Sequence, residues 1–292
     1  MLTLSALLLA AVTPNIADQE GPRVLVAGPT VARTLTYGPE QRQSLELFTR
    51  GKGRAPLIVY LHGGGWSDGS PKSGSRGAQA DHFTAGGYAY ATVGYRFVPE
   101  VTVEQQLADV ARAIAFLRRQ SGVDPGHVIL IGHSSGGHLA ALLGTDSAYL
   151  RAARVPFEAL RAIILLDPAV LDVVPVMTSR GAPTIERFFR PAFGDDAGRQ
   201  SALSPLRHSE PPNAPHWLSL YDAANRFAGA QSADLIAALI GAGAEQASAV
   251  SLSGTTHMRL NNEIGGAGDE ATKAIDAFLA RALPENRRPR FR

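Results

Sequence analysis

The sequence contains no cysteine among its 292 residues. This absence excludes disulfide bonds, a thiol nucleophile and cysteine-type zinc sites. Charge is also scarce, because only 18% of the residues are charged and the formal net charge is +2. The one basic cluster, at residues 287–292, is interpreted as a solvated tail. We therefore expect no nucleic-acid partner, no metal ion and no cofactor.

A long hydrophobic run is missing as well. Residues 1–12 are apolar but too few to span a bilayer, so no membrane partner is predicted. This run has the length of a signal-peptide core, and a candidate cleavage point at Ala17 follows it, although no Lys or Arg precedes it. We expect residues 1–20 to be a signal peptide of an exported protein, periplasmic or secreted. The alternative is an apolar N-terminal helix lying on the domain of a cytoplasmic protein.

Hydrophobic residues make up 45% of the chain, which suits one large α/β domain over residues 21–292. Short apolar segments predicted as strands alternate with amphipathic segments predicted as helices. This alternation indicates a mostly parallel central sheet with helices on both faces. The expected strands are residues 33–37, 44–48, 56–62, 88–95, 128–131, 162–166, 217–221 and 249–252, and the expected helices are residues 101–120, 232–240 and 270–283.

Residues 171–215 interrupt this alternation with seven prolines and few strong elements. We expect an insertion here over the C-terminal edge of the sheet, which is where ligands bind in folds of this type. Four aromatic residues are candidates for lining a pocket: Trp66, Phe188, Phe189 and Phe193.

The most informative motif is Gly-x-Ser-x-Gly at residues 132–136, directly after the apolar run 128–131. A strand that ends in this motif and continues as a helix is a nucleophile elbow, in which a sharp turn exposes the serine hydroxyl. The two glycines are needed because the strained turn leaves no room for a Cβ atom. The register assigns the nucleophile to Ser134, since Ser135 would need glycine at position 133, which is histidine.

A glycine-rich loop precedes the elbow. His62 and three glycines follow the apolar residues 57–61, in the pattern of an HGGG-type oxyanion loop. Consecutive glycines let backbone N–H groups point at one small atom, and acyl transfer needs such donors for the oxyanion. The partner donor is expected to be the N–H of Ser135, the residue after the nucleophile.

A serine hydroxyl also needs a base, and the chain order of such hydrolases requires a late histidine. His257 lies between the last expected strand and the final helix, and no other histidine follows residue 216. His82 has no assigned role, and the remaining histidines outside the motifs are interpreted as structural or solvated: His127, His138, His208 and His216. A carboxylate should follow the strand 217–221, where Asp222 stands at the strand end and Asn225 comes three residues later.

With these motifs in place, residues 33–283 resemble the α/β-hydrolase esterases of the group that contains bacterial feruloyl/acetyl-xylan esterase-like proteins and kynurenine formamidase-like enzymes. The resemblance implies the α/β-hydrolase fold, with Ser134 as nucleophile, His257 as base, and Gly64, Gly65 and Ser135 near the oxyanion. Besides the loop and the elbow, it is carried by residues 37–38, 43–47, 94–96, 109, 137–140, 166–172, 192–194, 204–205, 256–261 and 265.

The chain departs from this family at the acid, because the family usually has aspartate where Asn225 stands. An Asp-to-Asn exchange in a serine triad can cost about 10⁴-fold in kcat. Three interpretations remain. In the first, Asp222 replaces the missing acid, since three residues of chain span up to about 10 Å. In the second, Asn225 orients His257 without charge. In the third, the carboxylate comes from after an earlier strand, as Asp167 or Asp172.

The sequence thus predicts a metal-independent serine hydrolase that cleaves small-molecule carboxylic esters through an acyl-enzyme, with Asp222 as the first candidate for the acid. One alternative is an aryl-formamidase or amidase that uses the same site. A second alternative, favoured by Asn225, is a catalytically impaired binding protein that keeps the fold. The acyl group, the alcohol group and the oligomeric state are not indicated by the sequence.

Overall fold

The computed structural model describes residues 30–75, 78–178 and 182–283. The signal peptide expected at residues 1–20 and the basic cluster at residues 287–292 both lie outside these ranges. Among the helices of the described ranges, none is both long and apolar enough to cross a membrane.

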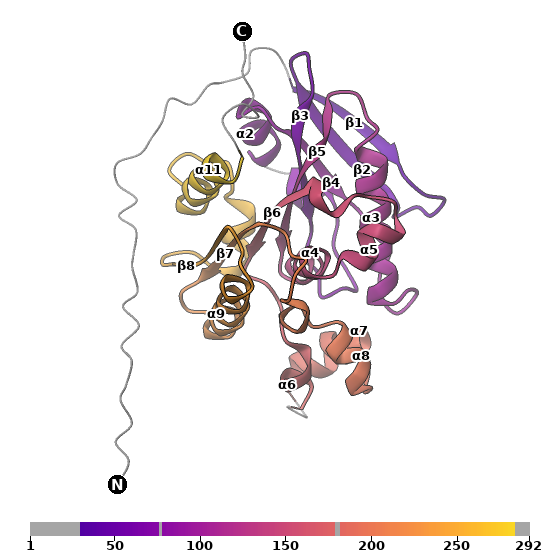
Figure 1. Cartoon of the computed structure of the whole chain (residues 1–292), viewed down its shortest axis with the longest axis vertical. Helices are drawn as coiled ribbons and strands as arrows, with labels where there is room; N and C mark the ends of the chain where they lie inside the picture. The colour runs from indigo at the N-terminus through magenta and orange to yellow at the C-terminus, as the bar shows by residue number, and fades with distance from the viewer. Residues whose placement is uncertain (1–29, 76–77, 179–181, 284–292) are drawn as a thin grey trace.

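An eight-stranded sheet forms the centre of the molecule (Figure 1), with the strand order β1-β2-β4-β3-β5-β6-β7-β8. β2 pairs antiparallel with β1 and β4, and all the other neighbours are parallel. The predicted α/β class with a mostly parallel sheet is therefore confirmed. The strands are β1 (Thr30–Thr36), β2 (Ser44–Arg50), β3 (Ala55–Leu61), β4 (Ala89–Val93), β5 (Val123–His133), β6 (Leu160–Leu166), β7 (His216–Asp222) and β8 (Gln246–Leu252).

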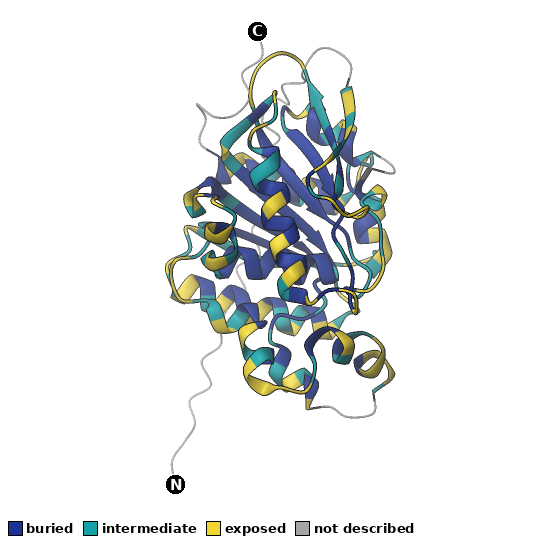
Figure 2. Cartoon of the chain, turned by 90° about the vertical axis from the view of Figure 1, so that its right-hand side faces the viewer, coloured by how far each residue is buried: buried dark blue, intermediate teal, exposed yellow. Residues whose placement is uncertain are grey.

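Helices cover both faces of this sheet, and two separate hydrophobic clusters result. α3, α4 and α9 pack on one face, whereas α2 and α11 pack on the other. The central strands are buried on both faces (Figure 2), which explains why they are almost entirely apolar. The helices of this layer structure are α1 (Lys72–Ser75), α2 (Gln79–Ala85), α3 (Val103–Leu117), α4 (Ser135–Thr145), α5 (Ser147–Ala152), η2 (Phe157–Ala159), α9 (Arg226–Gly241), α10 (His257–Asn262) and α11 (Glu270–Ala282).

The proline-rich segment expected as an insertion folds into short helices beyond the end of the sheet, where α6, α7 and α8 lie together in Figure 1. Proline lacks a backbone N–H and restricts the residue before it, so longer helices are disfavoured here. The elements are α6 (Val173–Met177), the π-helical turn η3 (Ile185–Phe189), α7 (Arg190–Phe193), α8 (Ala197–Ala202) and η4 (Pro205–His208).

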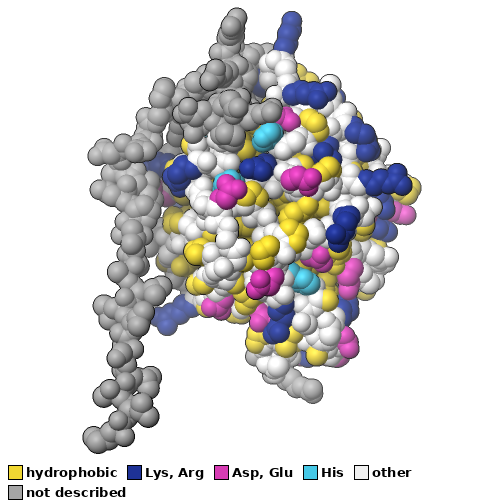
Figure 3. Space-filling model, in the orientation of Figure 1, with side chains coloured by type: hydrophobic (Ala, Val, Ile, Leu, Met, Phe, Trp, Pro, Cys, Tyr) yellow, Lys and Arg dark blue, Asp and Glu magenta, His cyan; other side chains and the backbone are white. Residues whose placement is uncertain are grey.

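Few large hydrophobic side chains reach the surface of the described residues. Acidic and basic side chains both appear across the face shown in Figure 3, with apolar side chains between them. The exposed large hydrophobic residues are Val31, Phe227, Ile240 and Met258. Two of them, Phe227 and Met258, border the cavity described below.

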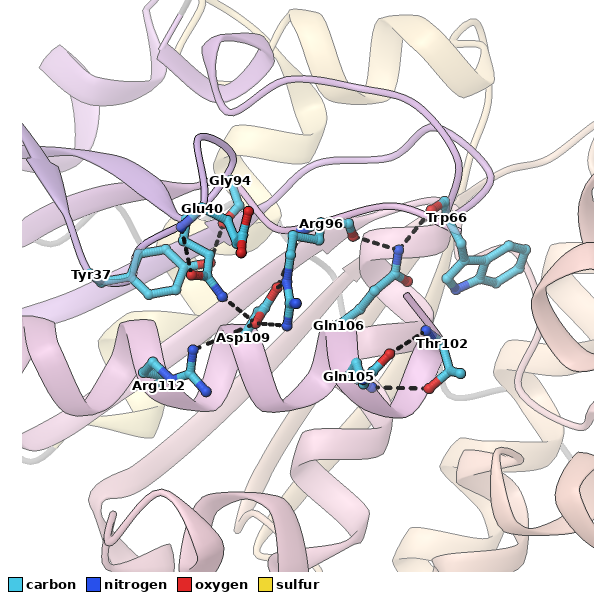
Figure 4. A network of polar contacts seen from close by, with 11 residues as sticks. Tyr37, Glu40, Trp66, Gly94, Arg96, Thr102, Gln105, Gln106, Asp109 and Arg112 are labelled. Atoms are coloured by element: carbon cyan, nitrogen blue, oxygen red, sulfur yellow. Dashed lines mark hydrogen bonds and ion pairs between the residues drawn. The ribbon is translucent and has the colours of Figure 1, made fainter. Parts of the chain in front are cut away.

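A buried polar network joins the first hairpin to α3 (Figure 4). The Asp109 carboxylate is fully buried on α3 and accepts hydrogen bonds from Gln43 Nε2 (2.8 Å) and from Arg96 Nε and Nη2 (both 2.8 Å). The hydrogen bonds that Arg96 donates to Asp109 raise the pKa of the Arg96 guanidinium. α3 also begins with a capping box between Thr102 and Gln105, which stabilises the N-terminus of the helix. The interpretation of Asp109 as a structural residue agrees with these contacts.

We predict that Asp109→Asn lowers the free energy of unfolding by about 1–3 kcal/mol, because the amide cannot accept all three hydrogen bonds and leaves buried polar groups unsatisfied. Urea denaturation followed by circular dichroism measures the change. Glu270→Gln at an exposed ion pair with Lys273 is the control, with an expected change within about 1 kcal/mol. Equal effects of the two substitutions would contradict this role of Asp109.

Candidate active site

Ser134 occupies a strained turn between β5 and α4. Its backbone has φ 55° and ψ −120°, a region that costs a non-glycine residue about 1–3 kcal/mol. Two hydrogen bonds hold the turn: the Ser134 N–H donates to the Leu166 carbonyl (3.0 Å), and the Ser134 carbonyl accepts from the Ala169 N–H (3.0 Å). The elbow geometry expected from the motif is therefore present, and it is bound to the loop that follows β6.

The glycines of the motif are required by close approach of backbone segments. A Cβ on Gly132 would lie 2.3 Å from the Gly136 carbonyl oxygen, and one on Gly136 would lie 2.3 Å from the Leu61 carbonyl oxygen at the end of β3. A Cβ on Gly63 would lie 2.9 Å from the Ser134 Cβ. Each of these distances is shorter than real Cβ atoms show, so a side chain would not fit at any of the three positions.

The glycine loop after β3 presents backbone N–H groups beside Ser134. Gly64 and Gly65 have φ values of 132° and 59°, and their N–H groups donate to no atom of the described residues. Ser135 is the first residue of α4, so its N–H has no acceptor within the helix. The positive end of the α4 dipole adds positive potential beside the Ser135 N–H. The arrangement suits an anionic oxygen.

Trp66 fixes the far end of the glycine loop. Its carbonyl accepts hydrogen bonds from Gln106 Nε2 on α3 (2.7 Å; Figure 4) and from the Val98 N–H (3.1 Å). Its indole N–H donates to His138 Nδ1 on α4 (3.3 Å). Gln106 was not identified from the sequence, although a glutamine on the mostly apolar face of α3 is a signal for such a bond.

A short hydrogen bond joins His257 to Asp167. His257 Nδ1 lies 2.6 Å from Asp167 Oδ2. Because an ionised carboxylate only accepts hydrogen bonds, Nδ1 carries the proton and Nε2 is left as an acceptor. The Asp167 side chain is fully buried directly after β6, whereas the His257 side chain, at the start of α10, is 42% exposed. The His257 ring can therefore exchange a proton with a group in the cavity through Nε2, while the bond from Nδ1 to Asp167 holds its orientation.

His133, the residue before Ser134, also supports His257. The two rings lie 4.5 Å apart between centroids, and His133 Nε2 is 2.9 Å from the His257 carbonyl oxygen. Since a carbonyl only accepts, His133 donates from Nε2. The histidine in the variable position of the serine motif thus connects the elbow to α10.

The carboxylate that contacts His257 is not Asp222, the first candidate from the sequence. Asp222 is the last residue of β7, and its Oδ1 accepts the Ala224 N–H (3.0 Å), which closes a turn instead of reaching the imidazole. Asp172 forms an ion pair with Arg207 (2.9 Å). Asn225 donates from Nδ2 to Asp167 Oδ2 (2.9 Å) and not to His257. Of the carboxylates expected near His257, the structure thus places Asp167, after the earlier strand β6, within hydrogen-bond distance of the imidazole, and it turns Asp222 away from it.

A cavity of about 1040 Å³ contains the site. Ser134, His257 and the three glycines of the loop line it, together with residues of the short helices after β6. Three of the four aromatic residues expected in a pocket line this cavity: Trp66, Phe188 and Phe189. Phe193 is instead fully buried, with its ring centroid 4.8 Å from that of Trp66, so it belongs to the core.

The remaining histidines make contacts away from His257. His82 and His127 pair with Asp276 (2.8 Å) and Asp124 (3.0 Å). His208 Nε2 lies near a backbone carbonyl, and His216 is 3.7 Å from Glu245. Among the residues that the structure describes, no group of three or more His, Asp or Glu side chains is placed to hold a metal ion.

Comparisons with known proteins agree with this architecture. Residues 45–158 match the BD-FAE family model. Neutral cholesterol ester hydrolase 1 of Rattus norvegicus is 35% identical over 124 residues, which are 39% of this chain and 29% of that protein. Esterase LipQ of Mycobacterium tuberculosis is 28% identical over 260 residues, which are 83% of this chain and 60% of that protein. The chain thus spans less than two thirds of the length of these curated relatives.

The crystal structure of esterase B from Lactobacillus Rhamnosis superposes with a TM-score of 0.70 at 20% identity and covers 88% of this chain and 86% of that one. The chain has the α/β-hydrolase fold. Together with the observed strand order, this likeness confirms the fold that the sequence resemblance implied. In this fold, the serine turn, the glycine loop and the histidine all lie at the carboxyl ends of the parallel strands.

We predict that Gly136→Ala prevents the elbow from forming, because the new Cβ meets the backbone oxygens of Leu61 and His62 at 2.3 and 2.4 Å. The expected loss is several kcal/mol of unfolding free energy, or no folded protein. Gly241→Ala at the end of α9 is the matched control, because nothing lies within 4 Å of its Cβ. That substitution should stabilise the protein by up to about 1 kcal/mol. Similar thermal midpoints for both variants would contradict the close approach.

Three buried histidines make the stability of the protein depend on pH. Burial lowers the pKa of His62, His133 and His138 from 6.5 to about 4. Between pH 6.5 and about 4, these histidines are therefore protonated in the unfolded chain but not in the folded chain. The free energy of unfolding should fall as the pH drops from 6.5 to about 4, by up to about 1.4 kcal/mol per pH unit for each histidine.

Urea denaturation across this pH range tests the linkage. His138→Gln removes one of the three groups and should reduce the slope by up to about 1.4 kcal/mol per pH unit. The neutral ring is required at position 138, because Nδ1 accepts from Trp66 while Nε2 donates to the Leu203 carbonyl (2.8 Å). An unchanged slope in the variant would contradict the assignment of a depressed pKa to this histidine.

Proposed function

We propose that this protein is a serine hydrolase of carboxylic esters. The observation that carries the proposal is the 2.6 Å bond between His257 and the buried Asp167 carboxylate, in a cavity that Ser134 also lines. A serine on a strained elbow and a histidine oriented by a carboxylate are the parts that nucleophilic acyl transfer requires. The names of the matched relatives, an esterase and a cholesterol ester hydrolase, support esters as the substrate class.

In the proposed reaction, Ser134 Oγ attacks the acyl carbon and His257 Nε2 takes the serine proton. The resulting imidazolium is stabilised by Asp167 through Nδ1–H. His257 then gives the proton to the leaving alcohol oxygen as the carbon–oxygen bond breaks, which leaves an acyl-enzyme on Ser134. Water repeats the sequence: His257 accepts its proton, the hydroxide oxygen bonds to the acyl carbon, and Ser134 recovers its proton as the acid leaves.

The oxyanion of each tetrahedral intermediate would be bound by the N–H groups of Gly64, Gly65 and Ser135. This assignment is supported by the absence of other acceptors for the two glycine N–H groups within the described residues and by the place of Ser135 at the start of α4. Removing one such donor from a serine hydrolase typically costs about 10²–10³-fold in kcat. The Gln106 bond to Trp66 would keep the loop in the binding geometry.

The cavity walls support an ester with an apolar group larger than acetyl. Phe188 and Phe189 face the cavity from η3, and Phe227 and Met258, which are 44% and 55% exposed, border it from α9 and α10. Apolar walls with a few polar groups are typical of pockets that bind small molecules. The binding-protein alternative rested on the lack of an acid at position 225, and the bond between Asp167 and His257 supports the hydrolase over it.

The test is turnover of p-nitrophenyl acetate and p-nitrophenyl butyrate by wild type and Ser134→Ala. We expect the substitution to lower kcat by at least about 10⁴-fold, because the nucleophile is lost while the fold is kept. Ser251→Ala, at an exposed position of β8, is the matched control and should keep the wild-type rate. Equal rates for wild type and Ser134→Ala would overturn the proposal.

A further inference from the structure

Asp167 Oδ2 accepts two hydrogen bonds, one from His257 and one from Asn225. His257 Nδ1 is 2.6 Å away and Asn225 Nδ2 is 2.9 Å away. The two donors come from different elements, α10 and the turn between β7 and α9. Asn225 Nδ2 and His257 Nδ1 are thus joined through one shared acceptor atom, Asp167 Oδ2.

The orientation of the Asn225 amide is determined by a second bond. Asn225 is the N-cap of α9, and its Oδ1 accepts the Ala228 N–H (3.2 Å). Since the oxygen of the amide is engaged by the helix, the NH₂ group is the end that faces Asp167. The helix cap therefore directs a donor toward the carboxylate.

The Asp167 carboxylate has little else to hold its orientation. Its Oδ1 is buried without a hydrogen-bond partner in the described part of the chain. Its backbone has a φ of 45°, which is uncommon for a residue other than glycine. The bond from Asn225 selects the rotation of the carboxylate that presents Oδ2 to His257, and it adds a donor without adding charge.

We propose that Asn225 is a positioning residue for Asp167: its amide holds the carboxylate rotation that presents Oδ2 to His257. The inference rests on the proposed hydrolase function. Because His257 and Asn225 donate to the same oxygen, the role of Asn225 exists only while a carboxylate stands at position 167.

The experiment compares four proteins: wild type, Asn225→Ser, Asp167→Asn, and the double variant Asp167→Asn/Asn225→Ser. Each is assayed with p-nitrophenyl butyrate for kcat and KM, and its thermal midpoint is recorded. Serine caps a helix as well as asparagine does but is too short to reach Asp167. Asn225→Ser thus removes the positioning bond and keeps the cap.

We expect Asn225→Ser to lower kcat about tenfold with KM and the thermal midpoint unchanged, because the lost bond is to a charged group. KM should not move, since Asn225 is not among the residues that line the cavity. Asp167→Asn should lower kcat by about 10³–10⁴-fold, and the double variant should be no slower than Asp167→Asn, because the carboxylate that Asn225 positions is already lost. A role for Asn225 in capping alone would leave kcat of Asn225→Ser at the wild-type value.

Wild-type kcat in Asn225→Ser, or a double variant about tenfold slower than Asp167→Asn, would overturn the inference. These results differ from a failure of the proposed function, in which Ser134→Ala would keep its activity. If the double variant does not fold, Asn225→Ser with its intact cap still decides whether Asn225 positions the acid.

Discussion

The site depends on the meeting of three backbone segments at the ends of β3, β5 and β6, with no room for a Cβ between them. Gly136 lies against the Leu61 carbonyl, and Gly63 lies against Ser134. This contact holds Ser134 in a conformation that a non-glycine residue does not otherwise adopt, and it brings the glycine loop beside the serine. The strain of the turn is offset by the packing of α4, whose residues are all buried.

The same contact explains how an acid after β6 can serve the site. The loop after β6 is bound to Ser134 on both sides, through the Leu166 carbonyl and the Ala169 N–H. The Asp167 N–H also donates to the Leu220 carbonyl of β7 (2.7 Å). The proposed nucleophile and acid therefore belong to one rigid backbone unit. His257 comes from a different part of the chain and is oriented by Asp167 and by His133.

Much of the architecture could be predicted because buried parallel strands are continuous apolar runs, as in β3 and β6. β5 was predicted only from residue 128, whereas it begins at Val123, because its first half contains polar residues and a bulge in its pairing with β3. α2 and α10 were not predicted, since helices of six or seven residues show too few turns for a periodic pattern.

In the site, Ser134 and His257 could be placed from motif and chain order, and the structure brings both to one cavity. The acid could not be chosen from the sequence, because Asp167 and Asp222 both follow parallel strands. The difference between them is the direction of the side chain: Asp222 turns back to the Ala224 N–H, whereas the positive φ of Asp167 directs its carboxylate to His257. Tertiary contacts set the direction of these side chains, and they also bring Gln106 to Trp66. Neither can be read from the local sequence.

The central claim is that the elbow, the glycine loop and the His257–Asp167 pair together activate one oxygen, Ser134 Oγ. Its most direct measurement is peptide mapping by mass spectrometry after the full chain reacts with a fluorophosphonate, which modifies activated serines. The account predicts a single adduct on Ser134, formed much more slowly in Asp167→Asn. An unmodified Ser134, or an adduct formed equally fast in Asp167→Asn, would contradict it.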